Sequence, residues 1–176
     1  MDTSNPITGI RLLLADALRT FQPLMDAIGG EHNLQVWDRP IDIRGDLSES
    51  ETGPRRIQMA PDGGRWAFNV SSGAVDFERR FAIEIYSNET TDAASPEFVE
   101  WLVIVAMAYL WEGLYPAQGG IPIEVPAPLI IDSIGVVEAK EDRNPFGADT
   151  ENWTGVCDVV VSGRVSRQAL KDWVNP

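Results

Sequence analysis

The sequence predicts an α+β fold in which a mostly antiparallel sheet is packed by two helices, in the order helix, strands, helix, two strands. Apolar residues recur every three or four positions in residues 7–28, which is the spacing of an amphipathic helix. Apolar and polar residues alternate in residues 77–86 and 153–165, as in half-buried strands. The length of 176 residues suits a single domain over residues 1–176.

The first element is expected to be one helix over residues 7–28. Pro23 can kink or end this helix, and the pair Gly29-Gly30 stops it. Alternation in residues 33–39 then predicts a short strand, and the polar, acidic residues 40–54 predict a long loop.

Two short strands are expected next, over residues 56–60 and 65–70, because the turn signal Pro61-Asp62-Gly63-Gly64 lies between them. A further break is expected at Ser71-Ser72-Gly73. In the strand over residues 77–86, the odd-numbered side chains share one face and the even-numbered side chains share the other.

A second helix is expected from Ser95 to Leu114. Its start has a hydroxyl at the N-cap, Pro96 at the first helical position and Glu97 in the first turn. Thirteen of the fourteen residues from 98 to 111 are apolar, so this helix must be covered on more than one side. Either the first helix or a second subunit supplies that cover.

The last part of the chain predicts a proline-rich linker over residues 116–128 and two long strands over residues 129–140 and 153–165. A loop over residues 141–152 joins these strands, and a polar tail or helical turn follows.

Composition excludes several classes of function. The chain has 14 Lys and Arg against 27 Asp and Glu, and a net charge of -13 is a poor match to a nucleic-acid backbone. One cysteine makes no internal disulfide, and one histidine makes no two-histidine metal motif. The start of the chain predicts no signal peptide, and the longest apolar run, residues 101–111, is shorter than the roughly 20 residues of a membrane span. We expect a protein that stays in a reducing compartment.

Few residues qualify for catalysis or ligand binding. His32 is interpreted as a loop histidine, because no Gly-x-Ser-x-Gly elbow supplies a nucleophile, and Cys157 as a small buried hydrophobe within a run of valines. The glycine pairs match no phosphate-binding motif, and no cofactor is expected. The acidic segments 42–51 and 138–142 could hold Mg²⁺ or Ca²⁺, or could simply be solvated.

Tryptophan and arginine are enriched at protein interfaces, and lysine is depleted there. The chain has twelve Arg against two Lys, and six Trp. Core packing is the alternative interpretation of the tryptophans. As candidate interface residues we select two tryptophans of the apolar helix and two pairs of arginines on the surface: Trp101, Trp111, Arg55, Arg56, Arg79 and Arg80.

The order of elements resembles the phage tail-terminator and tail-completion group. The resemblance is carried by the helix Ile7–Ile28, the strand at Val36-Trp37, the strand Arg80–Tyr86 that leads into the helix 95–114, and the closing strand Trp153–Val165. The acidic loop 40–54 and the linker 116–128 depart from that group.

The resemblance implies a structural virion protein without turnover, assembled in the host cytoplasm. Its copies would form a closed ring, with six-fold symmetry as the expectation, at the head-proximal end of a tail. The ring would cap the tail tube, meet a neck or connector protein, and let DNA pass without specific binding. Helix 101–111 and strand 79–86 would contribute to the ring, and loops 40–54 and 141–152 would make axial contacts.

Two alternatives stay open. The chain could be another head-tail connector or a minor tail subunit. In a different class of function, it could be an α+β domain that binds a small molecule or cation in an acidic pocket, or an enzyme built on such a pocket.

Overall fold

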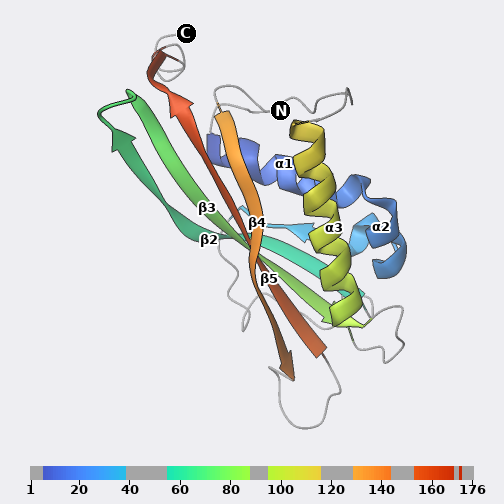
Figure 1. Cartoon of the computed structure of the whole chain (residues 1–176). Helices are drawn as coiled ribbons and strands as arrows, with labels where there is room; N and C mark the ends of the chain where they lie inside the picture. The colour runs from blue at the N-terminus through green and yellow to red at the C-terminus, as the bar shows by residue number, and fades with distance from the viewer. Residues whose placement is uncertain are drawn as a thin grey trace.

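The elements follow one another as α1 (Pro6–Thr20), α2 (Gln22–Ile28), the 3-10 turn η1 (Glu31–Asn33), β1 (Leu34–Val36), β2 (Arg55–Asn69), β3 (Ala74–Ser87), α3 (Pro96–Leu114), β4 (Leu129–Arg143) and β5 (Trp153–Ser166). They are seen in a computed structural model, which describes residues 6–38, 55–87, 95–115, 129–143, 153–168 and 171 (Figure 1). The predicted loops 40–54 and 116–128 lie outside the described residues, and one domain over residues 1–176 stays a prediction.

The five strands form one sheet in the order β1-β2-β3-β5-β4. β1 runs parallel to β2, and all other neighbours are antiparallel. The predicted α+β class with a mostly antiparallel sheet is therefore confirmed. β4 continues to Arg143, so the loop predicted over residues 141–152 begins later than expected, because its first residues extend the β4–β5 ladder.

The first helix is divided in two, where one helix over residues 7–28 was expected. Phe21 is extended, with φ -82° and ψ 91°, and α2 restarts with Pro23 in its first turn. Proline lacks an amide hydrogen and its ring clashes with the preceding turn, so the break falls just before it. Gly29 ends α2 in the left-handed region (φ 83°), as the glycine pair predicted.

β2 is a single long strand, so the prediction of two strands around a turn at residues 61–64 is wrong. Pro61 lies opposite Phe81 and Gly64 opposite Arg79, so β2 holds one extra residue, which is a β-bulge. Gly63 and Gly64 absorb it at φ 90° and φ 135°. A Cβ at Gly64 would collide with the carbonyl oxygen of Glu78.

The bulge changes which side chains of β2 face the helices. Before it, the odd-numbered Ile57 and Met59 lie opposite the core residues Ile85 and Ile83. Beyond it, the even-numbered Trp66 lies opposite Phe77. Directly opposed residues of an antiparallel pair share a face. Trp66 and Phe68 therefore continue the apolar, helix-facing side of the sheet.

The hairpin between β2 and β3 turns at the break predicted for residues 71–73. The side-chain oxygen of Asn69 accepts hydrogen bonds from the amides of Ser71 (3.1 Å) and Ser72 (3.2 Å), and Gly73 takes φ 63°. Figure 1 shows this turn projecting beyond the helices at one end of the sheet.

The core lies between the helices and one face of the sheet. The alternation in β3 and β5 was predicted correctly, and their odd-numbered side chains are buried: Phe77, Phe81, Ile83, Ile85, Cys157, Val159, Val161 and Val165. They pack with apolar side chains of all three α-helices. None of the helices in the described ranges is both long and apolar enough to cross a lipid bilayer.

Candidate interaction surfaces

α3 begins as its sequence predicts. Ser95 is its N-cap, and the Ser95 hydroxyl accepts a hydrogen bond from the amide of Phe98 at 3.3 Å. Pro96 occupies the first position, and Glu97 lies near the positive end of the helix dipole. One side of α3 is buried against α1, α2 and the sheet, through residues that include Val99, Val103, Leu110 and Leu114.

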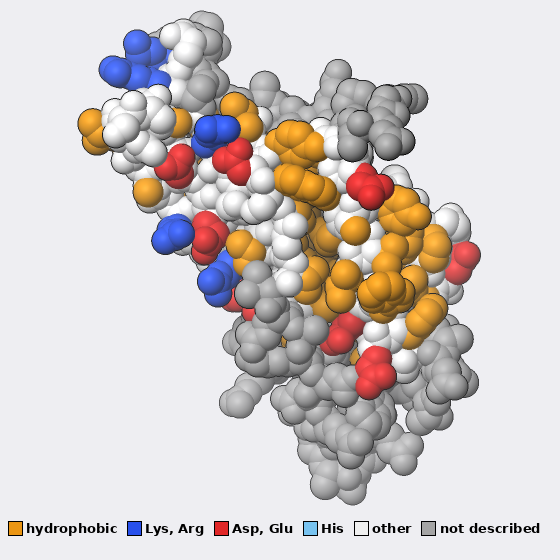
Figure 2. Space-filling view, viewed as in Figure 1, with side chains coloured by type: hydrophobic (Ala, Val, Ile, Leu, Met, Phe, Trp, Pro, Cys, Tyr) orange, Lys and Arg blue, Asp and Glu red, His pale blue; other side chains and the backbone are white. Residues whose placement is uncertain are grey.

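The opposite side of α3 stays exposed although it is apolar. Trp101 is 59% exposed and Tyr109 is 62% exposed, and Phe98 and Tyr115 are exposed as well. We call these four residues the α3 patch. Figure 2 shows the hydrophobic side chains gathered over this helix. The first helix therefore supplies only part of the cover that α3 was expected to need.

Neighbouring rings hold the α3 patch in place. The Tyr109 ring lies 5.6 Å from the Phe21 ring, and the Tyr115 ring lies 4.8 Å from the ring of Trp111, which is itself half-buried against the core. The Tyr115 hydroxyl donates a hydrogen bond to the carbonyl oxygen of Ile131. Tyr109 and Tyr115 of the patch are therefore preorganised, which lowers the entropic cost of binding a partner.

A second apolar surface lies at the β2–β3 hairpin. Phe68 is 59% exposed, Val70 is 83% exposed, and Trp66 is exposed above Phe77 with ring centroids 5.3 Å apart. We call Trp66, Phe68 and Val70 the hairpin patch. These residues were not singled out from the sequence, although their alternation towards a turn is a signal that could have found them.

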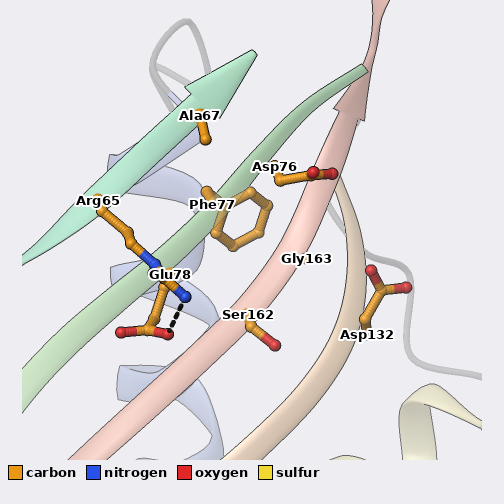
Figure 3. Close-up of a pocket in the computed structure, with 8 residues that line it drawn as sticks. All are labelled: Arg65, Ala67, Asp76, Phe77, Glu78, Asp132, Ser162 and Gly163. Atoms are coloured by element: carbon orange, nitrogen blue, oxygen red, sulfur yellow. Dashed lines mark hydrogen bonds and ion pairs between the residues drawn. The ribbon is translucent and has the colours of Figure 1, made fainter. Parts of the chain in front are cut away.

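The other face of the sheet carries a hollow of about 510 Å³ beside this hairpin, lined by Arg65, Ala67, Asp76, Phe77, Glu78, Asp132, Ser162 and Gly163. Figure 3 shows the Arg65–Glu78 ion pair within it, at 3.3 Å. Asp132 pairs with Arg164 at 3.3 Å, and the Ser162 hydroxyl lies 2.6 Å from that of Ser133. The lining is acidic on balance, because it combines Arg65 with the carboxylates of Asp76, Glu78 and Asp132, and Asp76 accepts a hydrogen bond from the side-chain amide of Asn69 at 3.2 Å.

The predicted surface position of Arg56 is wrong. Its side chain is 4% exposed, with the guanidinium 4.5 Å from the centre of the Tyr86 ring. On the same face, Gln58 is buried and its side-chain Oε1 accepts a hydrogen bond from the Trp37 indole at 3.1 Å. Burial lowers the pKa of Arg56, and burial raises the pKa of the neighbouring Glu84.

The other candidate arginines lie in different settings. Arg80 is exposed and its guanidinium is 3.8 Å from Glu78. Arg79 is half-buried, opposite Gly64 at the bulge. Arg55 begins β2. The structure thus places Trp101 in the α3 patch and Trp111 beside it, and it separates both from the four arginines, which lie on β2 and β3.

His32 and Cys157 are not brought together. His32 is exposed in η1, whereas Cys157 is a free, buried thiol in β5, as expected for a small hydrophobe. Burial, with smaller contributions from Glu100 and Asp158, raises the pKa of Cys157 to about 12. The thiolate nucleophile is therefore nearly absent at neutral pH.

Metal binding by acidic side chains was the other chemistry that the sequence left open. Within the residues that the structure describes, no group of three or more His, Cys, Asp or Glu side chains is arranged to hold a metal ion. The acidic segment 42–51 lies outside those residues, and the backbone of residues 138–142 belongs to β4.

Fold and surfaces together define an α+β protein with two exposed apolar patches. No protein-family model matches the chain, and no curated protein matches it. Among solved structures, it is similar to a chain of the "Virion of native gene transfer agent (GTA) particle" at 14% sequence identity and a TM-score of 0.47. That similarity covers 86% of this chain and 90% of the other.

Proposed function

We propose that the chain is a structural subunit of a phage-like virion and that its copies form a ring at the head-proximal end of the tail. The observation that carries this proposal is the α3 patch, an aromatic surface that a solitary soluble protein has little reason to expose. Removing the exposed apolar area of the patch from water, at about 25 cal/mol per Å², favours association with a partner.

The arrangement of elements supports the tail assignment. A helical N-terminal segment, a strand leading into a long helix and a closing antiparallel pair are the features on which the resemblance to the tail-terminator group rests. The division of the first helix and the long β2–β3 hairpin modify that arrangement without changing its order.

The proposed role is mechanical and involves no turnover. A ring that occupies the end of the tail tube stops further addition of tube subunits and offers a docking face to a neck or connector protein. The net charge of -13 would let DNA pass without being held, because like charges repel.

Rings and tube capping are the direct test. Electron microscopy of the purified chain should show closed rings, six-fold by expectation, and adding the chain to tail-tube subunits that are polymerising should stop tube growth. Rings that do not stop tube growth would instead favour another connector or a minor tail subunit.

The hollow beside the hairpin is the place where the competing proposal, a ligand-binding domain or enzyme, would have its site. A chain that stays monomeric and binds Mg²⁺ or Ca²⁺ in calorimetry would favour that proposal and contradict the ring.

A further inference from the structure

We infer that the ring is joined by one particular contact, in which the hairpin patch of one copy packs on the α3 patch of the next. This inference rests on the proposed function, and it names the surfaces that the ring proposal leaves open. Figure 1 shows the β2–β3 turn projecting at one side of the molecule and α3 lying at the other, so the two patches belong to separate elements. Both can therefore be occupied at the same time.

The two patches are matched in chemistry. The α3 patch is a row of rings on a helix, and the hairpin patch brings two aromatic side chains and one valine on a projecting turn. The patch residues are 39–83% exposed, so each patch has room to form the apolar centre of a standard interface of about 800 Å² per partner, with polar residues completing the rim.

The charges beside the patches favour contact between an α3 patch and a hairpin patch over contact between two α3 patches. α3 contains no Lys or Arg, and Glu97 and Glu112 are exposed along it. The hairpin turn has a basic neighbour, because the exposed Arg167 lies close to Gly73, whereas Arg65 is on the other face of the sheet and pairs with Glu78. Two α3 patches would bring acids together, whereas an α3 patch against a hairpin patch brings an acid to Arg167.

Pairing of unlike patches has a consequence for symmetry. Each copy then donates its hairpin patch to one neighbour and offers its α3 patch to another, which is a head-to-tail contact. Such contacts generate a ring when the rotation between neighbours closes. Pairing of α3 patches alone, or of hairpin patches alone, would stop at a dimer.

Two blocked variants test this contact. Trp101→Glu places a charge in the α3 patch, and Phe68→Glu places one in the hairpin patch. Both positions are exposed, so both variants should fold, which circular dichroism checks. Each variant alone should be monomeric, with self-association weakened about 30-fold or more. Ile130→Glu, at an exposed apolar position outside both patches, is the matched control and should assemble like the wild type.

Mixing the two blocked variants gives the decisive result. Each retains one intact patch, so an equimolar mixture should form a 1:1 dimer that grows no further. Assembly by either variant alone, or a mixture that stays monomeric, overturns the contact. A wild type that forms rings while the mixture stays monomeric overturns this contact and leaves the proposed function standing. A wild type that never associates overturns both.

A charge exchange supplies a second, milder measurement. Glu112→Lys and Arg167→Glu should each weaken self-association on their own, because each places like charges at every contact. An equimolar mixture of the two variants should recover assembly by alternating them, because the introduced lysine then meets the introduced glutamate and the native Glu112 meets the native Arg167. The double variant restores opposite charges across every contact and should assemble again. Loss of assembly in the double variant, with the fold intact, contradicts the charge argument.

Discussion

Trp66 lies directly opposite Phe77 in the β2–β3 ladder, with ring centroids 5.3 Å apart on the helix-facing side of the sheet. Without the bulge between Pro61 and Gly64, the alternation of β2 would turn Trp66 and Phe68 to the other face. The extra residue thus creates the hairpin patch, and through it the surface that we propose to join neighbouring subunits.

The bulge predicts different effects for two adjacent glycines. Gly64→Ala should lower the free energy of unfolding by about 2–4 kcal/mol, because its Cβ meets the Glu78 carbonyl oxygen at a φ of 135°. Gly63→Ala has a positive φ but open space, so its loss should be smaller, about 1–2 kcal/mol. Urea unfolding compares the two variants, and equal losses would contradict the role given to the close approach at Gly64.

Substitution of the buried Arg56 should lower the free energy of unfolding, whereas substitution of the exposed Arg80 should hardly change it. Arg56→Ala removes the stacking on Tyr86 and the cation beside Glu84, and should lower the free energy of unfolding by about 2 kcal/mol. Arg80→Ala, at an exposed side chain, should change it by less than about 0.5 kcal/mol. Thermal unfolding of both variants checks this, and a silent Arg56→Ala would mean that its burial contributes no stability.

Cys157 should give the protein a pH-dependent stability at alkaline pH. Its pKa is raised to about 12 from 9.0, so above pH 9 the unfolded chain loses this proton while the folded chain keeps it. Its contribution is therefore complete below pH 9 and is lost as the pH rises towards 12, with a slope of at most about 1.4 kcal/mol per pH unit. Unfolding of Cys157→Ala should lack this part of the slope. An unchanged slope in the variant would assign the alkaline loss to other groups.

The exposed and buried sides of α3 should respond in opposite ways. Trp101→Ala should abolish assembly and leave the unfolding of the dilute, monomeric chain within about 0.5 kcal/mol of the wild type. Val103→Ala, at a fully buried position, should cost about 2 kcal/mol and leave the patch in place. Sedimentation and chemical unfolding measure the two properties separately. A Trp101→Ala chain that still assembles would remove the α3 patch from the interface.

The sequence predicts elements well where local signals agree. Ser95 and Pro96 mark the start of α3, and the alternation around Phe81 and Val159 identifies the buried faces of β3 and β5. The prediction from sequence fails at Pro61–Gly64, because the residue types that favour a turn are also the ones found in a β-bulge. Only long-range pairing of β2 with β3 distinguishes the two.

The exposed surfaces were likewise predicted where local signals suffice and missed where they depend on long-range packing. The all-apolar composition of α3 predicts a helix that needs a partner, but the side left bare depends on where α1 and α2 pack. The burial of Arg56 could not be foreseen, because it depends on Tyr86 and on neighbours such as Gln58 and Trp37 that are brought there by sheet pairing. The hairpin patch depends on the bulge and was missed for the same reason.

Sedimentation velocity of the wild-type chain over a dilution series tests the central claim most directly. A subunit that closes into a ring through its α3 patch should give one oligomer of fixed mass in equilibrium with monomer, and Trp101→Glu should give monomer throughout. A wild-type chain that is monomeric at every concentration, or that grows without a limiting mass, would contradict the account.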